Sequence, residues 1–473
     1  MKYEYNDLLC RKRVRPSTVK RQRSIDDFYS DRSRILYCSS FRRLQQKAQV
    51  FSMETNSSVR SRLTHSLEVS DLGRTLANEI GYKLKANKDC RLSATNIPAL
   101  VAVVENACLL HDIGNPPFGH FGEAAIQDWA KHQASKTLPA DVAWDQNLQK
   151  LMKDFEEFDG NPQGFRTVTK LHCDVDEHGL NLTYATLLCG LKYARAAGEP
   201  EGKGILKKAG WFQTEQALVE RLFGELDLPL GTRYPLTYIM EAADDIAYCM
   251  SDIADGIEKR ILTEEEFHRT FTRQWLKKYD EKSLKALKLP QASELRNFSQ
   301  DFSVRWAKKA MAEAVKNFVD HHEEIYAGTA GAIIDEKYGT MGKVLETIKA
   351  VSCEVLYPSI EAESIELTGY AVITGILRHY ERLLKLKYED FKVVADRQGR
   401  KMAVEQRLFN RIGHRCVQAY KKAVEALDEQ DPAFAQTEWW LRVHLLVDHI
   451  SSMTDAFALE TYQMLEGIAL MRT

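Results

Sequence analysis

The stretch IPALVAVVENACLLHDIGNPPFGHFGEAA, residues 97–125, decides the fold of this 473-residue chain. Its first half is a long apolar run, and Pro98 lies where proline favours the first turn of a helix. We expect a helix that begins after Asn96 and carries His111 and Asp112 at its end, where Gly114 stops it. The run therefore predicts a helical core with two chemically active side chains at one end.

The second half of this stretch predicts a turn followed by another helix. Pro116 and Pro117 end the first helix, because proline lacks a backbone N–H and clashes with the preceding turn. A new helix should begin near Gly119. It would place His120 and Glu123, three residues apart, on one face.

An earlier helix is expected over about residues 64–87. Apolar residues recur every four positions from Leu72 to Leu84, and His65 lies one heptad before Leu72 on the same stripe. That pattern predicts a histidine that faces the interior.

A long helix predicted over residues 235–258 carries its polar side chains on one face. Five carboxylates share this face without a Lys or Arg: Glu241, Asp244, Asp245, Asp252 and Asp255. Because like charges one turn apart repel, the cluster favours a bound cation, and Tyr248 in its centre indicates a cleft. An acidic surface without a ligand is the alternative.

Composition excludes several classes of protein. A hydrophobic fraction of 44% and a formal net charge of −2 do not fit a disordered chain, and no stretch approaches the roughly 18 apolar residues of a membrane helix. The basic, polar N-terminus is not a secretory signal, so we expect a cytoplasmic protein without membrane contact. Nine scattered cysteines without a C-x-x-C pair predict reduced thiols.

Only 12 prolines and 25 glycines occur, which favours an all-α fold with at most a small β-hairpin. We divide the chain into a basic N-terminal segment at 1–62, a helical core at 63–260 and a C-terminal helical region at 261–473. The core includes a less regular insertion at about 130–232, where a short hairpin would fall. The C-terminal region is expected to complete the substrate site and to provide oligomer contacts.

Charge is unevenly distributed along the chain. The segment through Arg62 holds 15 Lys or Arg residues and six Asp or Glu residues. A basic arm on an acidic body favours a polyanionic partner, either nucleic acid or a nucleotide polyphosphate. A merely solvated arm is the alternative.

His65, the His111–Asp112 pair and the acidic helix offer imidazole and carboxylate ligands from three helices. That mixture suits Mn, Fe, Co, Ni or Zn and tolerates Mg less well. A histidine on a buried stripe is often an ordinary core residue, so the residues alone leave the metal open. The chain lacks G-x-x-x-x-G-K-[ST], which excludes a P-loop NTPase.

Several segments resemble the HD-domain deoxynucleoside triphosphate triphosphohydrolases. The three metal motifs of that family are matched by RLTHSLEV at 62–69, HDIGNPPFGHFGE at 111–123 and EAADDIAY at 241–248. Further similarity lies in FRRLQQKAQVF at 41–51, GNPQGFR at 160–166 and DHISSMTD at 448–455. Within the family, the set is most similar to the bacterial dGTP-hydrolysing branch. FDGN at 158–161 departs from the FEGN expected there, which affects only the assignment of Asp159.

The resemblance implies an HD-domain helical bundle and a role for each matching residue. Four residues would ligate the metal: His65, His111, Asp112 and Asp244. His120 would be the catalytic histidine, with Glu123 hydrogen-bonded to it to set its tautomer. Substrate contacts are implied for Gln49 at the sugar 3′-hydroxyl, Arg62 at the α-phosphate, Tyr248 and Asp252 at the deoxyribose, and Asn161 and Gln163 from the insertion.

The implied reaction is metal-dependent hydrolysis of dGTP to deoxyguanosine and inorganic triphosphate, which would control the dNTP pool. One divalent ion, Mg, Mn or Co, would serve each active site. The resemblance also implies a homohexamer and binding of single-stranded DNA. The base-reading residues stay open, because the candidates lie in no matching motif: His379, Arg407, Arg411 and Arg442.

Three other functions remain compatible with the sequence. One is a dNTP triphosphohydrolase of broader specificity. Another is an HD phosphohydrolase acting on cyclic nucleotides, alarmones or nucleoside monophosphates, although Gln49, Arg62 and Tyr248 favour a deoxyribose triphosphate. The third is a nucleic-acid-binding protein with a regulatory HD site, which predicts steep salt dependence and little turnover.

Overall fold

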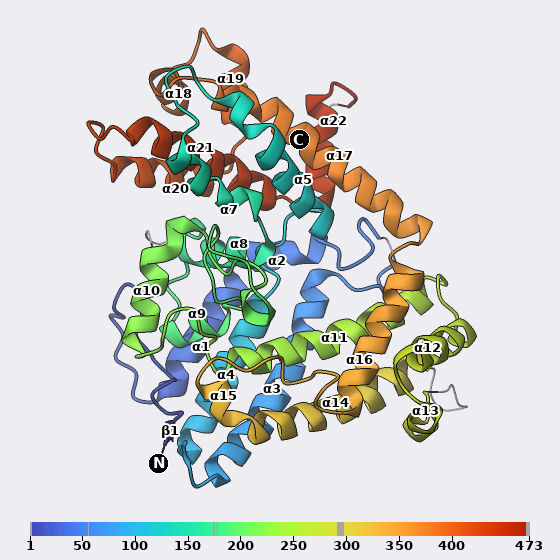
Figure 1. Cartoon of the computed structure of the whole chain (residues 1–473). Coiled ribbons are helices and arrows are strands. Elements are labelled where there is room, and N and C mark those ends of the chain that lie inside the picture. Colours follow the sequence, from blue (N-terminus) through green and yellow to red (C-terminus); the bar gives the residue numbers. More distant parts are fainter. Residues whose placement is uncertain (1, 55, 174–175, 177, 291–297, 470–473) are drawn as a thin grey trace.

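A computed structural model describes residues 2–54, 56–173, 176, 178–290 and 298–469 of the chain. Within these residues the protein is built almost entirely from helices, and the expected all-α class is confirmed (Figure 1). The longer helices are α1 Ser24–Tyr37, α3 Arg62–Ala86, α4 Ile97–Leu110, α5 Gly119–His132, α10 Gln216–Glu225, α11 Thr237–Glu258, α12 Glu264–Lys278, α14 Phe298–Asp320, α16 Thr340–Val351, α17 Ile360–Leu384, α20 His414–Glu425, α21 Phe434–Ser451 and α22 Asp455–Leu465. Shorter helices are α2 Ser39–Arg43, α6 Gln146–Leu151, α7 Lys153–Glu156, α8 Gly160–Arg166, α9 Tyr184–Cys189, α13 Glu281–Leu287, α15 His322–Tyr326, α18 Tyr388–Ala395 and α19 Ala403–Phe409.

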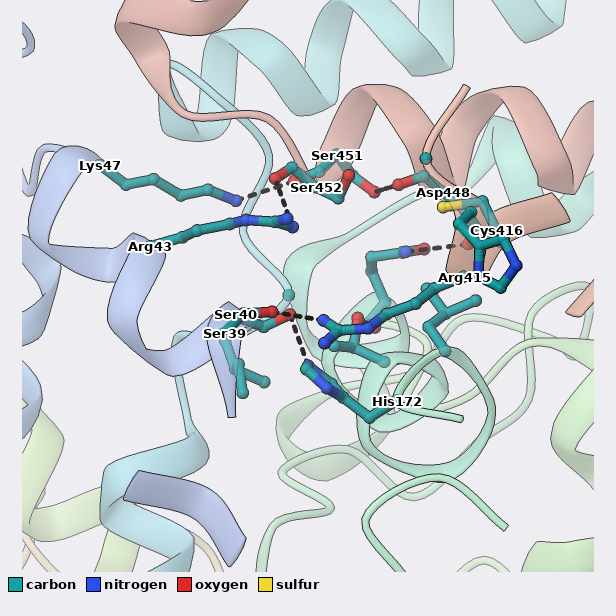
Figure 2. A pocket seen from close by; sticks show the side chains of 17 residues that line it. Ser39, Ser40, Arg43, Lys47, His172, Arg415, Cys416, Asp448, Ser451 and Ser452 are labelled. Carbon is teal, nitrogen blue, oxygen red and sulfur yellow. Dashed lines mark hydrogen bonds between the residues drawn. The ribbon is translucent and has the colours of Figure 1, made fainter. Parts of the chain in front are cut away.

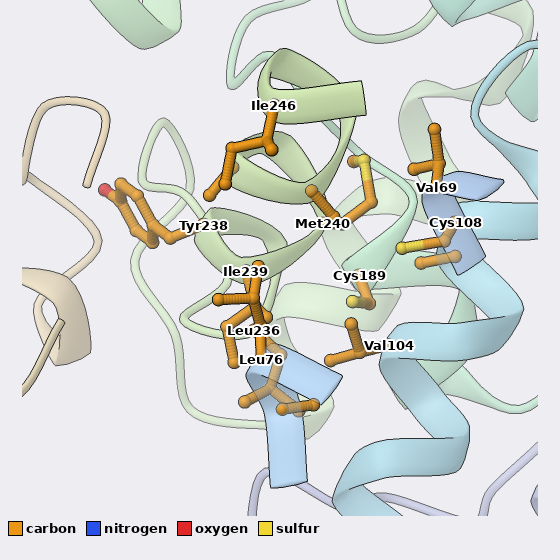
Figure 3. Packing of buried hydrophobic residues seen from close by; sticks show 14 of the residues in the cluster. Val69, Leu76, Val104, Cys108, Cys189, Leu236, Tyr238, Ile239, Met240 and Ile246 are labelled. Carbon is orange, nitrogen blue, oxygen red and sulfur yellow. The ribbon is translucent and has the colours of Figure 1, made fainter. Parts of the chain in front are cut away.

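The first of two apolar cores forms where α3, α4 and α11 pack together. Figure 3 shows Leu76 of α3, Val104 of α4 and Ile239 of α11 among its buried side chains. A capping box fixes the start of α3, because the Ser61 side chain accepts from the Thr64 N–H and the Thr64 hydroxyl accepts from the Ser61 N–H. This cap satisfies the N–H groups at the start of α3, whose buried stripe packs against α4 and α11.

A second apolar core lies in the upper part of Figure 1, between α5, α17, α20 and α21. Phe118, at the start of α5, belongs to this second core, whereas Ile113 belongs to the first. The turn between α4 and α5 therefore passes from one core to the other.

The small sheet differs from the expected hairpin. β1 Tyr3–Glu4 pairs in parallel with β2 Cys90–Arg91, far from the insertion. The described part of residues 130–232 instead forms short helices and 3-10 turns, while residues 174, 175 and 177 lie outside the description. The Gly, Asp and Asn clusters of the insertion supply turns, but no flanking segments alternate as paired strands would.

No helix in the described part of the chain combines the length and the apolar character needed to cross a bilayer. All nine cysteines are free, as their scattered pattern predicts.

Candidate active site

The His111–Asp112 pair lies in a tight turn at the end of α4. The helix ends at Leu110, and His111 occupies its C-cap position. Gly114 is needed in this turn because a Cβ there would lie 2.0 Å from the Gly164 nitrogen and 2.2 Å from the Gly160 oxygen. The turn thus packs backbone against backbone on α8, which holds His111 and Asp112 in place.

Side chains from three helices converge at this turn. Asp244 Oδ1, on α11, lies 3.4 Å from His65 Nε2 and 3.5 Å from His111 Nε2. Ligand atoms of these three residues all lie within 4.8 Å of one another. Asp112 Oδ2 is 3.6 Å from His111 Nε2 and accepts a 2.9 Å hydrogen bond from Arg62 Nη1. The four residues expected to ligate a metal are therefore neighbours, with His65, His111 and Asp244 forming the tightest group.

The hydrogen bonding of this group fits a divalent cation. His111 Nδ1 lies 2.7 Å from the Cys108 carbonyl oxygen, so it carries the proton and leaves the Nε2 lone pair facing the cluster. Within the described chain, neither nitrogen of the fully buried His65 ring nor His111 Nε2 has a hydrogen-bond partner. Buried polar atoms without partners are costly, and a cation bound between the two Nε2 atoms would satisfy both of them.

Both carboxylates of the cluster are held in the ionised form that metal ligation requires. Burial raises the pKa of Asp112, but the charges of Arg62, His111 and His65 together outweigh it and bring the pKa to about 2. Burial acts on Asp244 in the same direction. Lys192, whose Nζ lies 2.9 Å from Asp244 Oδ2, nevertheless holds the pKa of Asp244 well below its usual range, together with His111.

The acidic face of α11 is compensated from other elements, contrary to the expectation of an uncompensated stripe. Partners from outside the helix reach every member: Arg233 for Glu241, Lys192 for Asp244, Lys349 for Asp245, the Tyr357 hydroxyl for Asp252 and Arg60 for Asp255. Only Asp244 joins the histidine cluster. Periodicity along a helix does not reveal these partners, because all of them lie outside the helix and four of the five come from distant parts of the chain.

A cavity of about 400 Å³ opens over the cluster. Nine of the predicted site residues line it: Gln49, Arg62, His111, Asp112, His120, Glu123, Asn161, Asp244 and Tyr248. His65 is buried beside this lining, and Asp252 lies behind it. Gln163 instead lines a second cavity, where its Nε2 donates to Asp448 Oδ1 at 3.0 Å.

His120 stands at the start of α5, on a strained piece of backbone. Phe118 and Gly119 both have left-handed φ values, 61° and 57°, and Asp455 Oδ1 accepts the Phe118 N–H at 3.0 Å. A Cβ on residue 119 would lie 2.8 Å from Arg62 Nη2, so glycine also makes room for that guanidinium. Burial is the main cause that lowers the pKa of His120, and the positive charges of Arg62 and Lys208 lower it further. At neutral pH the imidazole is therefore uncharged.

Glu123 has a different partner from the one expected. Its Oε1 accepts a 2.8 Å hydrogen bond from the Gly160 N–H, and no hydrogen bond joins Glu123 to His120 among the described residues. Burial, and next the negative charge of Asp159, raise the pKa of Glu123. Glu123 thus ties α5 to the start of α8.

Tyrosine hydroxyls connect the cavity to Asp252. The Tyr248 and Tyr357 hydroxyls are hydrogen-bonded to each other, and Tyr357 donates to Asp252 Oδ2 at 2.7 Å. Asp252 is only 1% exposed, and burial raises its pKa to about 7. Asp252 therefore supports the wall formed by the two tyrosines.

The sequence analysis missed several lining residues, among them Lys192, Tyr193, Lys208 and Tyr357. The two lysines come from loops of the irregular insertion, and Lys208 is paired with Asp159. No motif or spacing marks the two lysines, because folding of these loops alone brings them to the cavity. None of the four open base-reading candidates lines it, and Arg442 is held by Glu438 and by main-chain carbonyls.

Comparison with known proteins identifies the family of this chain. An HD domain model matches residues 62–151. Two curated relatives are both named deoxyguanosinetriphosphate triphosphohydrolase. One, from Klebsiella pneumoniae strain 342, is 37% identical, and one from Klebsiella pneumoniae subsp. pneumoniae strain ATCC 700721 / MGH 78578 is 36% identical; each alignment covers 98% of both chains. This chain therefore belongs to the HD-domain deoxyguanosinetriphosphate triphosphohydrolase family.

Proposed function

We propose that this protein hydrolyses dGTP to deoxyguanosine and inorganic triphosphate. One observation carries the proposal: a histidine–aspartate cluster suited to a divalent cation lies in a cavity that also holds three cationic side chains, Arg62, Lys192 and Lys208. A triphosphate needs several positive charges, and a cavity of about 400 Å³ is within the range of small-molecule sites.

His65, His111, Asp112 and Asp244 would hold one divalent ion, with Mg, Mn and Co as the candidates. When bound, the ion would supply Lewis acidity at the phosphoryl group that reacts. Imidazole and carboxylate ligands together favour Mn or Co over Mg.

Arg62, Lys192 and Lys208 would bind the phosphates. Within the described chain Arg62 makes a single ion pair, with Asp112, and its Nε has no partner, so it retains donors for the α-phosphate. Lys192 and Lys208 each pair with one carboxylate and, as ammonium groups, have further N–H donors for the β- and γ-phosphates. Together they would neutralise the charge of the triphosphate, which keeps the attacked α-phosphorus while the 5′-oxygen of the nucleoside departs.

His120 would act as the proton-transfer group of the reaction. Because its pKa is lowered, the imidazole is neutral at pH 7 and can accept a proton from the attacking water. The departing 5′-oxygen of the nucleoside needs one proton, which balances the one released by water. Glu123 would act as a positioning residue by fixing α5 against α8 through Gly160.

Tyr248 and Tyr357 would pack against the deoxyribose, with Asp252 holding Tyr357 in place. A close aromatic wall at C2′ leaves no room for a ribose hydroxyl. Gln49, whose buried Oε1 has no partner in the described chain, offers an acceptor for the sugar 3′-hydroxyl, and Asn161 lines the same cavity.

The C-terminal region would complete this site, since Tyr357, Ile365 and Glu366 all line the cavity. Much of the positive charge of the N-terminal segment is paired with carboxylates within the protein, for example Arg13 with Asp31. This pairing favours a hydrolase over a protein that only binds nucleic acid. Assembly as a hexamer, binding of single-stranded DNA and residence in the cytoplasm stay predictions.

The test is incubation of the purified protein with each of the four dNTPs and with GTP in Mn²⁺ or Mg²⁺, followed by ion-exchange separation of the products. We expect deoxyguanosine and intact triphosphate from dGTP and no product from GTP. Equal cleavage of all four dNTPs would replace the guanine preference with broad specificity. Release of pyrophosphate, or no turnover, would contradict the proposal.

A further inference from the structure

A second cavity, of about 340 Å³, lies on the other side of the α4–α5 turn. Figure 2 shows Arg43 and Lys47 entering it from one side and Arg415 from the opposite side. Hydroxyl groups of Ser39, Ser40, Ser451 and Ser452 share its lining. The cavity plays no part in the reaction proposed above.

The charges of this cavity are predominantly positive. Arg43 donates to the Ser452 carbonyl oxygen, and Lys47 donates to the carbonyl oxygens of Asn115 and Ser451. Neither cation forms an ion pair within the part of the chain that the structure describes. Asp448 is the one carboxylate in the lining, and Arg166 already binds both of its oxygens.

The N-terminus of α20 also opens into the cavity. Gly413 is its N-cap residue and has no capping side chain, and the Cys416 N–H donates to the Gly413 carbonyl oxygen; Gly413, His414, Arg415 and Cys416 all line the space. The helix dipole favours an anion at such a position. The α20 N-terminus and the cationic side chains therefore both favour an anion in this cavity.

A buried glutamine in the lining restricts the chemical class of the ligand. Gln163 lines the cavity and is 2% exposed, and its Oε1 has no hydrogen-bond partner in the described chain. This oxygen accepts hydrogen bonds, so the ligand that satisfies it carries an O–H or N–H group as well as negative charge. Burial lowers the pKa of Lys47 to about 7, and a bound anion would restore its protonated form.

We propose that this cavity is a binding site for a phosphate group that carries a donor, either hydrogen phosphate or a hydroxylated phosphate monoester. Arg43, Arg415, Lys47 and the α20 N-terminus bind the phosphate oxygens, and Gln163 accepts the donor. The volume exceeds that of phosphate alone and has room for a small ester.

Ligand binding in this second cavity affects the metal cluster through a chain of hydrogen bonds. Lys47 Nζ donates to the Asn115 carbonyl oxygen at 2.5 Å, and the Asn115 side-chain amide donates to Asp112 Oδ1. Ile113 and Gly114, from the same turn, form part of the cavity wall. A ligand that draws Lys47 away from Asn115 therefore alters the support of Asp112.

The test is calorimetric titration of the metal-free full-length protein with inorganic phosphate, ribose 5-phosphate and sulfate at constant ionic strength. We expect saturable binding of at least one of the two phosphates and weaker binding of sulfate, which has no proton at pH 7. Stronger binding of ribose 5-phosphate would identify an ester as the ligand, and equal or stronger binding of inorganic phosphate would identify the free ion.

Arg43→Gln should weaken binding about tenfold or more, because it removes a charge-assisted hydrogen bond. Arg42→Gln is the matched control, since Arg42 is a neighbouring exposed arginine of α2 that donates to the Tyr37 carbonyl oxygen and lies outside the cavity lining. Equal loss in both variants, or no saturable binding, would overturn the proposal. So would loss confined to Arg62→Gln, which would place the anion in the catalytic cavity.

Binding needs no turnover, so this result is independent of the proposed hydrolysis. In the presence of substrate, the bound phosphate should change kcat or KM for dGTP in the unaltered protein and in Arg42→Gln, and not in Arg43→Gln. Tight binding with unchanged kinetics in all three would refute the link to Asp112.

Discussion

Replacement of Asp252 by Asn should make the protein less sensitive to rising pH. Asp252 is buried to 1% exposure, and its Oδ2 accepts a hydrogen bond from Tyr357 that asparagine can retain through its own oxygen. Burial raises the pKa of this carboxyl from 3.8 to about 7. Asparagine has the same shape but cannot ionise, so the variant isolates the cost of the buried charge.

The sign follows from proton binding in the two states. Between pH 3.8 and pH 7 the folded protein keeps the Asp252 proton, whereas the unfolded chain releases it. The folded state then binds more protons, and the free energy of unfolding falls as pH rises. Each pH unit in this window is worth about 1.4 kcal/mol, so unfolding free energy should fall by up to about 3 kcal/mol between pH 5 and pH 7 from this group alone.

Urea denaturation at pH 5 and pH 7, followed by tryptophan fluorescence in EDTA, measures the effect. The stability of Asp252→Asn relative to the unaltered protein should increase between the two pH values. Asp141→Asn, which changes an exposed loop carboxylate, should show no such increase. A constant difference between Asp252→Asn and the unaltered protein would refute the buried, protonated state of Asp252.

Three further predictions concern the catalytic cavity. His65→Ala should abolish the stabilisation by Mn²⁺, which is about 2.7 kcal/mol at 100 times Kd, whereas the exposed His132→Ala should keep it in the same thermal-shift assay. His120→Ala should retain the Mn²⁺ response but lose about 10²-fold or more in kcat. Because the pKa of His120 is lowered, the acid limb of the pH profile of kcat/KM in the unaltered enzyme should lie below pH 6.5. Full turnover, or a limb above 6.5, would remove His120 from proton transfer. Tyr357→Phe should raise KM for dGTP about tenfold with the Mn²⁺ response unchanged, since it leaves Asp252 without its donor; an unchanged KM would contradict the sugar wall.

Helical periodicity predicted the core elements closely. The helix expected at 64–87 runs over Arg62–Ala86, and the one expected at 235–258 runs over Thr237–Glu258. A new helix begins at Gly119, as the paired prolines indicate. These elements could be predicted because apolar spacing, caps and proline are local signals that tertiary contacts reinforce here.

Long-range contacts could not be predicted in the same way. Lys192 reaches Asp244 from a loop, and Glu123 binds the Gly160 N–H rather than His120. Gln163 lies on the side of α8 that faces Asp448 and the second cavity. Each of these pairings depends on how an irregular segment folds back, which neither period nor spacing encodes.

The structure shows what the C-terminal DHISSMTD segment contacts and supports. Asp455 accepts the Phe118 N–H through one carboxylate oxygen and the Ala48 N–H and Ser52 hydroxyl through the other. It therefore ties the strained start of α5 to the segment that carries Gln49. The sequence marked this segment by its resemblance alone.

The central claim is that water attacks the α-phosphorus of dGTP at the histidine–aspartate cluster. The most direct measurement is hydrolysis of dGTP in H₂¹⁸O with Mn²⁺, followed by mass spectrometry of both products and compared with His111→Ala. We predict one ¹⁸O atom in triphosphate, none in deoxyguanosine, and no product from the variant. Isotope in deoxyguanosine, or label in released phosphate or pyrophosphate instead of triphosphate, would contradict attack at the α-phosphorus.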